Sequence, residues 1–138
     1  MWVLKGTMRR VFVFKNIAIK TPLDIKGYLA NINEIHNWYK YKQYREHLCP
    51  IILHDLLGFI VVMKRVQPVY DLDEYDISFM DYTIPVFNDI KRNNFGLLDD
   101  NLVKIDYGND YWLYNIWIDI RNKLIENKCC NWKLYVLL

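Results

Sequence analysis

Five polar residues spread along this chain have the side-chain types that phosphoryl transfer requires. That reaction needs a cation on the phosphates, an acid that fixes this cation, a carboxylate at the incoming hydroxyl, and two oxygen-bearing side chains for Mg²⁺. Lys20 and Glu34 are a suitable cation and acid, and Asp89 is a suitable carboxylate. Asn94 and Asp106 carry the two oxygen-bearing side chains. All five residue types are therefore present, although no single one of them is specific to this chemistry.

The most specific segment lies in the second half of the sequence. It reads Phe87-Asn88-Asp89-Ile90-Lys91-Arg92-Asn93-Asn94 and is followed, after an apolar-rich run, by Asp106-Tyr107-Gly108. It resembles the catalytic loop H-R-D-L-K-x-x-N and the D-F-G motif of protein kinases. A lone D-x-x-x-x-N pattern means little, but the two motifs together, with β-branched residues leading into the second acid, favour the kinase interpretation.

The resemblance implies a role for each residue that matches these motifs. Asp89 falls on the catalytic acid that orients the substrate hydroxyl, and Lys91 falls on the lysine that neutralises the γ-phosphate. Asn94 and Asp106 fall on the two ligands of Mg²⁺, or of Mn²⁺ in its place. A short hairpin with Asp99-Asp100-Asn101 as its turn is expected to return the chain, so that Asp106 meets Asn94 across the metal site.

A second resemblance lies near the start of the sequence. Ile17-Ala18-Ile19-Lys20 resembles the V-A-I-K strand of kinases, whose lysine pairs with the α- and β-phosphates of ATP. Val11-Phe12-Val13-Phe14 reads as the preceding strand, with Lys15-Asn16 as a tight turn, so the two runs predict a hairpin. Taken alone, Lys20 is an ordinary lysine at a strand end, and only the downstream motifs favour the phosphate-binding interpretation.

The residues after this hairpin predict an amphipathic helix. Thr21-Pro22-Leu23-Asp24 is a good helix start, with Thr21 as the N-cap. Apolar residues then recur at helical spacing, as the stripe Ile25, Leu29, Ile32, Ile35 and Tyr39. On the resemblance this is helix αC of the kinase fold, and Glu34 is the acid that pairs with Lys20. The alternative is that Glu34 is a solvated helix carboxylate.

Two further apolar runs predict buried strands. These are Pro50-Ile51-Ile52-Leu53 and Phe59-Ile60-Val61-Val62-Met63, joined by a turn around Gly58. In kinases the second of these strands runs into the hinge. On the resemblance Met63 matches the gatekeeper position, and Lys64-Arg65-Val66 matches the segment whose backbone bonds adenine. The alternative is a core strand that ends in two basic residues.

Two departures from the kinase pattern affect the expected mechanism. In place of the glycine-rich loop there is one glycine, Gly6, followed by Arg9 and Arg10, which could supply charge to the phosphates instead. Phe87 and Asn88 stand where kinases have His-Arg. Without that arginine there is no cation to answer a phosphorylated activation loop, so we expect constitutive activity.

The sequence after Gly108 is short for a kinase. It contains no A-P-E motif, and it leaves no room for the helical subdomain that docks peptide substrates. Residues 111 to 127 predict one amphipathic helix. We expect either a minimal kinase that packs its catalytic loop on this helix, or a chain that borrows surface from a second copy or from a protein partner. The apolar segment from Trp132 to Leu138 suits such an interface, and equally suits a last strand.

The composition is that of a compact domain: of 138 residues, 53% are hydrophobic and 25% are charged. A net charge of +2 favours neither nucleic acid nor a membrane surface as a partner. The three cysteines lack metal-ligand spacing and fit a reducing cytosol. Without a long apolar run or a signal-peptide pattern we expect a cytoplasmic protein. The abundance of Asn, Ile, Tyr and Lys suits an AT-rich bacterial, phage or viral genome, and for a phage or virus the compartment is the host cytoplasm.

The sequence therefore predicts one α+β domain of protein kinase type across residues 1–138. A small antiparallel N-lobe sheet with one helix is expected over residues 1–66, and a much reduced helical C-terminal part over residues 67–138. The expected activity is transfer of the γ-phosphate of Mg-ATP to a Ser or Thr hydroxyl of a protein. The alternative is a pseudokinase, a nucleotide-binding interaction module without turnover, which the missing glycines and the missing substrate lobe favour.

Overall fold

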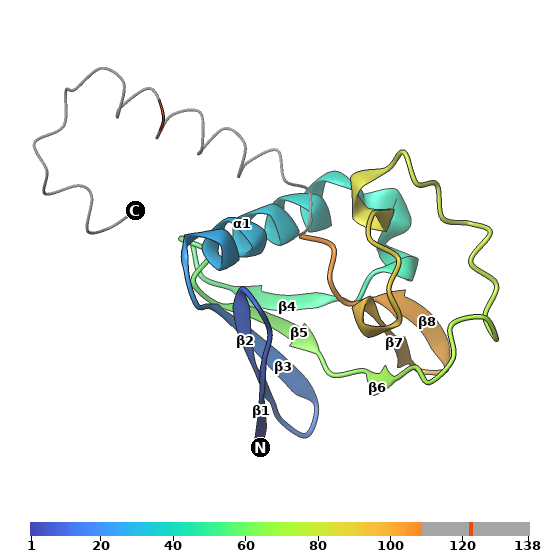
Figure 1. The fold of residues 1–138 in the computed structure, drawn as a ribbon, viewed down its shortest axis with the longest axis horizontal. Coiled ribbons are helices and arrows are strands. Elements are labelled where there is room, and N and C mark those ends of the chain that lie inside the picture. The colour runs from blue at the N-terminus through green and yellow to red at the C-terminus, as the bar shows by residue number, and fades with distance from the viewer. Residues whose placement is uncertain (109–121, 123–138) are drawn as a thin grey trace, which may run out of the picture.

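The computed structural model describes residues 1–108 and residue 122. They form an α+β protein in which a five-stranded antiparallel sheet packs with one long helix (Figure 1). The predicted α+β class, with an antiparallel sheet and one helix, is therefore confirmed. The strands lie in the order β1-β2-β3-β5-β4, and their bounds are β1 Trp2–Lys5, β2 Arg9–Val13, β3 Ile17–Pro22, β4 Ile51–His54 and β5 Val61–Lys64.

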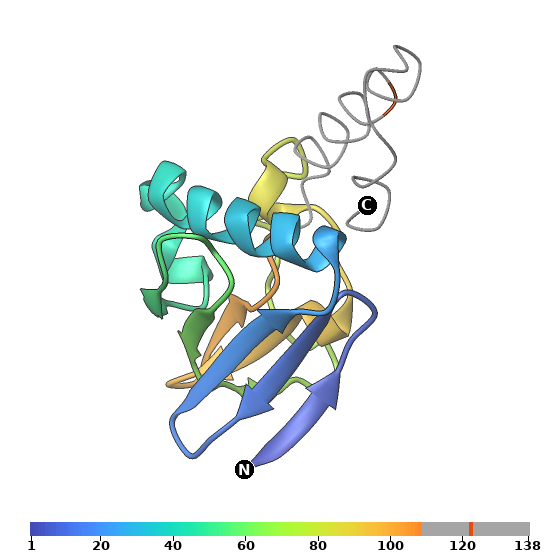
Figure 2. The same ribbon diagram turned by 90° about the vertical axis from the view of Figure 1, so that its left-hand side faces the viewer.

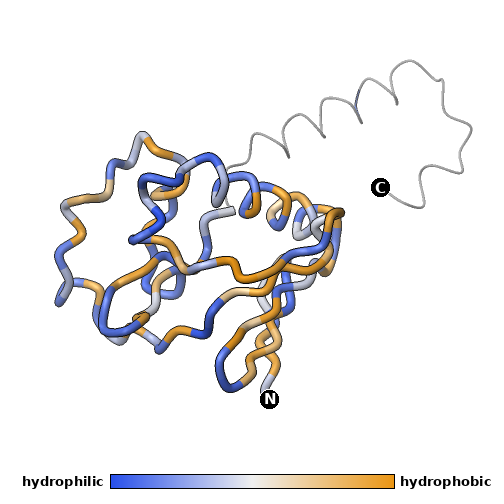
Figure 3. The backbone as a smooth tube through the Cα atoms, turned by 180° about the vertical axis from the view of Figure 1, so that it is seen from behind, coloured by the Kyte–Doolittle hydropathy of each residue, from blue (hydrophilic) through white to orange (hydrophobic). Residues whose placement is uncertain are grey.

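The first three strands form two consecutive hairpins. β2 pairs antiparallel with both neighbours, so that Val13 lies opposite Trp2 in β1 and opposite Ala18 in β3. The turn between β2 and β3 is hydrophilic, while the strands that enter it are largely apolar (Figure 3). The predicted hairpin that ends at Lys20 is thus confirmed. β1 is an additional edge strand that the sequence did not indicate.

β5 is the strand that connects the two halves of the sheet. It pairs with β3, where Lys20 lies opposite Val61, and with β4 on its other side. Val61 and Met63 are almost completely buried, because β5 has neighbours on both sides and the core on one face. The two predicted apolar strands are therefore present, and the second is the more buried of the two.

Helix α1 (Ile25–Lys40) lies across one face of the sheet (Figure 2). The helix begins later than predicted. Strand β3 extends to Pro22, which pairs with Arg9, so Thr21 is part of the sheet and cannot cap the helix. Asp24 is the N-cap instead, and its side chain accepts a hydrogen bond of 2.9 Å from the backbone N–H of Gly27.

The buried face of α1 is polar, which the apolar stripe did not predict. None of the five apolar stripe residues is fully buried, and Tyr39 is 51% exposed. The buried positions are Gly27, Ala30, Asn31, Asn33, Glu34 and Asn37. Buried amide and carboxylate groups require hydrogen-bond partners, so this face must be matched by polar groups of another element.

A second, smaller sheet follows in the order β6-β7-β8, with bounds β6 Gln67–Pro68, β7 Phe95–Leu98 and β8 Asn101–Lys104. β7 and β8 form the predicted hairpin. Its two turn residues, Asp99 and Asp100, have φ of 50° and 64°, the left-handed conformation that two-residue hairpin turns use. A backbone hydrogen bond of 2.8 Å from Cys49 to Lys104 connects this sheet to the segment before β4.

Short 3-10 helices complete the described fold: η1 Lys42–His47, η2 Pro85–Phe87 and η3 Arg92–Asn94. The main core cluster contains residues of β4, β5, β7, β8 and the segment 69–87. Its members with 1% exposure or less are Leu48, Cys49, Val61, Val86, Phe87 and Tyr107. No helix within the described residues is long and apolar enough to cross a membrane. The helix predicted for residues 111–127 and the apolar segment 132–138 lie outside the described residues, apart from residue 122.

Candidate functional site

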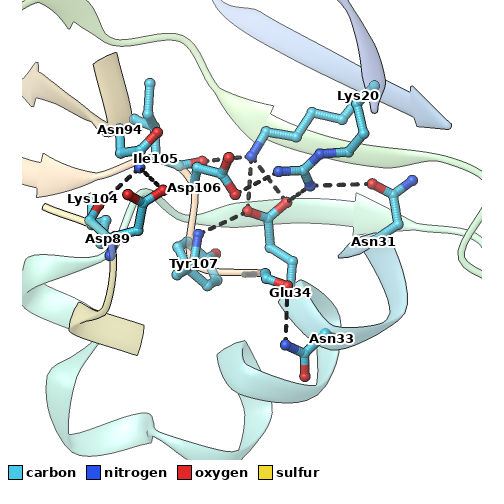
Figure 4. A network of polar contacts seen from close by, with 12 residues as sticks. Lys20, Asn31, Asn33, Glu34, Asp89, Asn94, Lys104, Ile105, Asp106 and Tyr107 are labelled. Carbon is cyan, nitrogen blue, oxygen red and sulfur yellow. Dashed lines mark hydrogen bonds and ion pairs between the residues drawn. The ribbon is translucent and has the colours of Figure 1, made fainter. Parts of the chain in front are cut away.

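Lys20 and Glu34 form a buried ion pair between β3 and α1 (Figure 4). The Lys20 ammonium donates to both Glu34 carboxylate oxygens, at 2.8 Å and 2.9 Å. Glu34 is 0% exposed and Lys20 is 7% exposed. A carboxylate and an ammonium at such depth are stable only when each has the other and further hydrogen bonds besides. The alternative of a solvated Glu34 is therefore wrong.

The chain that leads into Asp106 closes around this ion pair. The Lys20 ammonium donates a third hydrogen bond, of 2.5 Å, to the carbonyl oxygen of Ile105. The backbone N–H of Tyr107 donates to Glu34 Oε1 at 3.2 Å. Asp106 therefore sits between two residues whose backbones are bonded to the Lys20–Glu34 pair, although it is far from them in sequence.

Arg9 enters the same cluster from β2. Its guanidinium Nη1 donates to Glu34 Oε2 at 2.9 Å and to Asn31 Oδ1 at 3.3 Å, and Nη2 donates to Asp106 Oδ1 at 2.5 Å. We call Arg9, Lys20, Glu34 and Asp106 the buried ion cluster. The sequence offered Arg9 and Arg10 as equal sources of charge, but neighbouring residues of a strand face opposite sides. Arg9 points inward and is 7% exposed, whereas Arg10 is exposed.

The electrostatics of the cluster follow from this pairing. Burial acts to lower the pKa of Arg9, but the carboxylates of Glu34 and Asp106 outweigh it and raise that pKa above its ordinary value. Burial acts to raise the pKa of Asp106, and the positive charges of Arg9 and Lys20 reverse this, so that its pKa is lowered. Asp106 is therefore ionised at neutral pH.

Two asparagines of α1 hold the Asp106-Tyr107-Gly108 segment in place. Asn37 Nδ2 donates to the Tyr107 carbonyl oxygen at 2.7 Å, and Asn33 Nδ2 donates to the Gly108 carbonyl oxygen at 3.0 Å. Gly108 passes so close to the helix that a Cβ there would lie 2.3 Å from the Ala30 carbonyl oxygen. Neither asparagine was among the predicted site residues, although three Asn and one Glu within seven helix positions are a visible signal of a polar contact face.

Asp89, Lys91 and Asn94 form a second group of contacts. Lys91 Nζ lies 2.8 Å from Asp89 Oδ1, and Asn94 Nδ2 donates to the Asp89 carbonyl oxygen at 2.9 Å and to Asp89 Oδ2 at 3.1 Å. The hydrogen bond from Lys91 is the largest cause of a lowered pKa at Asp89. Asp89 has φ of 57°, a left-handed backbone that turns its side chain toward these two partners.

Lys104 is a buried lysine that sequence analysis did not single out. It is 1% exposed, and its ammonium donates to the carbonyl oxygen of Asn88, beside Asp89. Burial lowers its pKa to about 8, while the charges of Asp106 and Asp89 act in the opposite direction. Both carboxylates thus lie within electrostatic reach of one lysine. In Figure 4, Asp106 is drawn between the Lys20–Glu34 pair and the Asp89–Asn94 pair.

The remaining candidate residues lie at different places in the fold. Gly6 is in the β1–β2 turn, where its backbone N–H donates to the Arg9 carbonyl oxygen at 2.9 Å. Met63 is buried in β5. Arg65 is exposed and donates to the carbonyl oxygens of Phe14 and Lys15, at 3.2 Å and 3.4 Å. The side chain of Arg65 is therefore engaged with the β2–β3 turn rather than with the ion cluster.

The donor set of Asp106 and Asn94 suits a hard cation. The part of the chain that the structure describes holds no group of three or more His, Cys, Asp and Glu side chains able to bind a metal. Mg²⁺ needs no such cage, because it binds through one or two protein oxygens together with substrate phosphates. The N–H groups of the Asn94 amide are directed at Asp89, which leaves its oxygen as the ligand atom. One oxygen of Asp106 is bonded to Arg9.

Comparisons with known proteins give no match: no protein-family model, no curated protein and no solved structure matches this chain. The geometry of the site is therefore the evidence from which a function is proposed.

Proposed function

We propose that this chain is a phosphotransferase of the protein kinase type, which moves the γ-phosphate of Mg-ATP to a Ser or Thr hydroxyl of a protein. The observation that carries the proposal is the buried Lys20–Glu34 pair with Asp106 beside it. Three residues far apart in the sequence meet there, in the combination that phosphoryl transfer uses. A helix–sheet contact has no structural need for a buried ion cluster, since apolar residues of similar volume stabilise such contacts as well or better.

Each residue of the site then has a role in binding or in transfer. Lys20, held by Glu34, would bind the α- and β-phosphates with the N–H that it gives to the Ile105 carbonyl oxygen here, and Asn94 and Asp106 are the residues that would hold Mg²⁺. The bound cation supplies charge stabilisation to the phosphates. Asp89, already ionised, accepts the hydrogen bond of the substrate hydroxyl and orients it toward the γ-phosphate. Lys91 neutralises charge on the transferring group.

The arrangement of the described elements supports this proposal. The sheet order β1-β2-β3-β5-β4 with one helix against β3 is consistent with the small lobe of a kinase. The hairpin β7–β8 separates Asn94 from Asp106 and returns the chain, because Ile105 N–H donates to the Asn94 carbonyl oxygen at 2.8 Å. The two proposed metal ligands therefore flank the open end of one hairpin.

We place the adenine of ATP beside Met63 and the segment that follows it. Within that segment the backbone N–H groups of Lys64 and Arg65 donate to carbonyl oxygens of the protein itself, at 3.1 Å and 2.9 Å. Val66 is then the residue whose backbone N–H we propose as the donor to adenine. The Arg65 side chain, turned to the β2–β3 turn, has no part in this contact.

The test is turnover of [γ-³²P]ATP with Mg²⁺ or Mn²⁺, using autophosphorylation and a generic basic protein as acceptors. Wild type is expected to transfer label, while Asp106→Asn and Asp89→Ala are expected to lose transfer by at least a hundredfold, a typical loss when one transition-state contact is removed. Asp73→Asn, at an exposed acid outside the site, is the matched control and should retain activity. Unchanged transfer by Asp89→Ala would end its catalytic assignment.

A second candidate function is a pseudokinase that binds nucleotide without turnover. The observation that favours it is the contact of Arg9 with Asp106, since this guanidinium occupies one of the two carboxylate oxygens that Asp106 could offer to a metal ion. The same assay separates the two. No transfer, together with a rise in melting temperature when nucleotide is added, would identify the binding module.

A further inference from the structure

Arg9 is a buried arginine to which the proposed reaction assigns no role. It lies at the start of β2, directly after the β1–β2 turn, and contacts carboxylates that come from two other parts of the chain. Glu34 belongs to α1, and Asp106 follows β8. The guanidinium therefore connects the first hairpin, the helix and the proposed metal ligand.

The charges of the buried ion cluster are already balanced in the protein alone. Arg9 and Lys20 contribute two positive charges, and Glu34 and Asp106 contribute two negative charges. A divalent cation on Asp106 would lie beside the Arg9 guanidinium, and like charges at contact distance repel strongly in a buried site. Arg9 and a metal ion therefore compete for Asp106.

The two ends of the Arg9 guanidinium are held unequally. Nη1 is fixed deep in the protein, with Glu34 at 0% exposure and Asn31 as its partners. Nη2 is bonded to Asp106, whose side chain is 27% exposed. The planar fork of arginine lets one end change partner while the other end keeps its own. The exchange is therefore expected at the solvent side of the cluster.

We propose that Arg9 is a positioning residue that holds Asp106 in the free protein and gives it up when Mg-ATP binds. Its Nη2 then turns from the Asp106 carboxylate to a phosphate oxygen, while Nη1 keeps Glu34. This inference rests on the proposed function, because it takes Asp106 as the metal ligand. It implies that the free protein binds a divalent cation weakly, since without phosphate the displaced end of Arg9 gains no new partner.

The proposal is tested by titrating Mn²⁺ into the whole chain without nucleotide, with free Mn²⁺ measured by electron paramagnetic resonance. Arg9→Met is expected to bind Mn²⁺ at least tenfold more tightly than wild type, which corresponds to about 1.4 kcal/mol. Arg10→Met is the matched control: it removes the same charge from the neighbouring, exposed residue and should bind like wild type. Adding Asp106→Asn to Arg9→Met should abolish the gain.

Arg9→Lys keeps the charge of the cluster and provides for the case in which Arg9→Met does not fold, as judged by circular dichroism. A single ammonium is expected to stay with the buried Glu34, so Asp106 is released and Mn²⁺ affinity again rises, by several-fold. Equal Mn²⁺ affinity in wild type and in every folded Arg9 variant would overturn the proposal. If the Arg9 variants gain Mn²⁺ affinity but wild type transfers no phosphate, the result counts against the proposed function alone. If wild type transfers phosphate but the Arg9 variants gain no Mn²⁺ affinity, the result counts against the role of Arg9 alone.

Discussion

At the residue scale, Glu34 is the acid to which both cations of the buried ion cluster are hydrogen-bonded. It accepts hydrogen bonds from Lys20, from Arg9 and from the backbone of Tyr107, and it has no exposed surface. One carboxylate thus pairs with both buried cations of the cluster, although it balances only one of their two charges. Such a group is far more costly to remove than to replace together with its partners.

We predict that Glu34→Gln destabilises the fold by about 3 kcal/mol, because it leaves Lys20 and Arg9 buried with Asp106 as their only nearby acid in the cluster. The measurement is urea denaturation followed by circular dichroism. Glu74→Gln, at an exposed position, is the control and should change the unfolding free energy by less than about 0.5 kcal/mol. Equal stability of the two variants would mean that the ion cluster is hydrated in solution.

Motif spacing brought attention to Lys20 and Glu34 because both lie in recognisable local sequence, a strand end and a helix. Arg9 could not be chosen over Arg10 in the same way. Because successive side chains of a strand point to opposite faces of the sheet, the two arginines must face opposite sides. Only the position of the helix in the folded protein decides which of these sides is buried. Lys104 was not predicted for a related reason, because a lysine in a short hairpin strand is ordinarily exposed. Here its side chain is buried and donates to the carbonyl oxygen of Asn88.

At the element scale, the sequence pattern of α1 misled because its apolar stripe is only partly buried, while its fully buried positions are mostly polar. The helix packs its amide side chains on the backbone of Tyr107 and Gly108, which arrives from far along the chain. An apolar stripe predicts the buried face of a helix only when the helix packs against apolar groups. Here α1 packs against backbone carbonyl groups, so its amide side chains are the buried ones. The strands were easier to predict, because β-branched runs between turn residues have one ready interpretation.

Gly27→Ala is expected to destabilise the fold, although helix propensity alone predicts that it stabilises the fold. Alanine at a helix position ordinarily stabilises by up to about 1 kcal/mol relative to glycine. At Gly27 a Cβ would lie 2.0 Å from the backbone carbonyl oxygen of Met8, so the β1–β2 turn must move away from the helix. We expect Gly27→Ala to destabilise by at least 1 kcal/mol in thermal unfolding, and to weaken the Arg9 contacts that follow that turn. Lys26→Ala, at the exposed preceding position, is the control; a stabilised Gly27→Ala would show that the turn does not rest on the helix.

At the scale of the whole molecule, the first sheet with its helix and the second sheet are joined by buried contacts, and one core cluster contains residues of both sheets. The ion cluster spans both, and Tyr107 packs between them with its hydroxyl donating to the Cys49 carbonyl oxygen at 2.9 Å. These contacts relate residues far apart in sequence, which is why local patterns predicted the hairpins and the helix but not how they meet. The resemblance to kinase motifs predicted the pairing of Lys20 with Glu34. It did not predict the contacts of Arg9 with Glu34 and Asp106.

Because Tyr107 belongs to both halves, the described part of the chain is expected to unfold as one unit. Tyr107→Ala removes a side chain that is 1% exposed and should cost about 4 kcal/mol. Hydrogen exchange should then speed up in β5 of the first sheet as much as in β8 of the second, since both depend on the same global opening. Tyr107→Phe, which loses only the hydroxyl bond, should lower protection in both sheets by about 1 kcal/mol. Faster exchange confined to residues 95–104 would instead show that the second sheet opens independently, and the ion cluster would then be a contact between two units that fold separately.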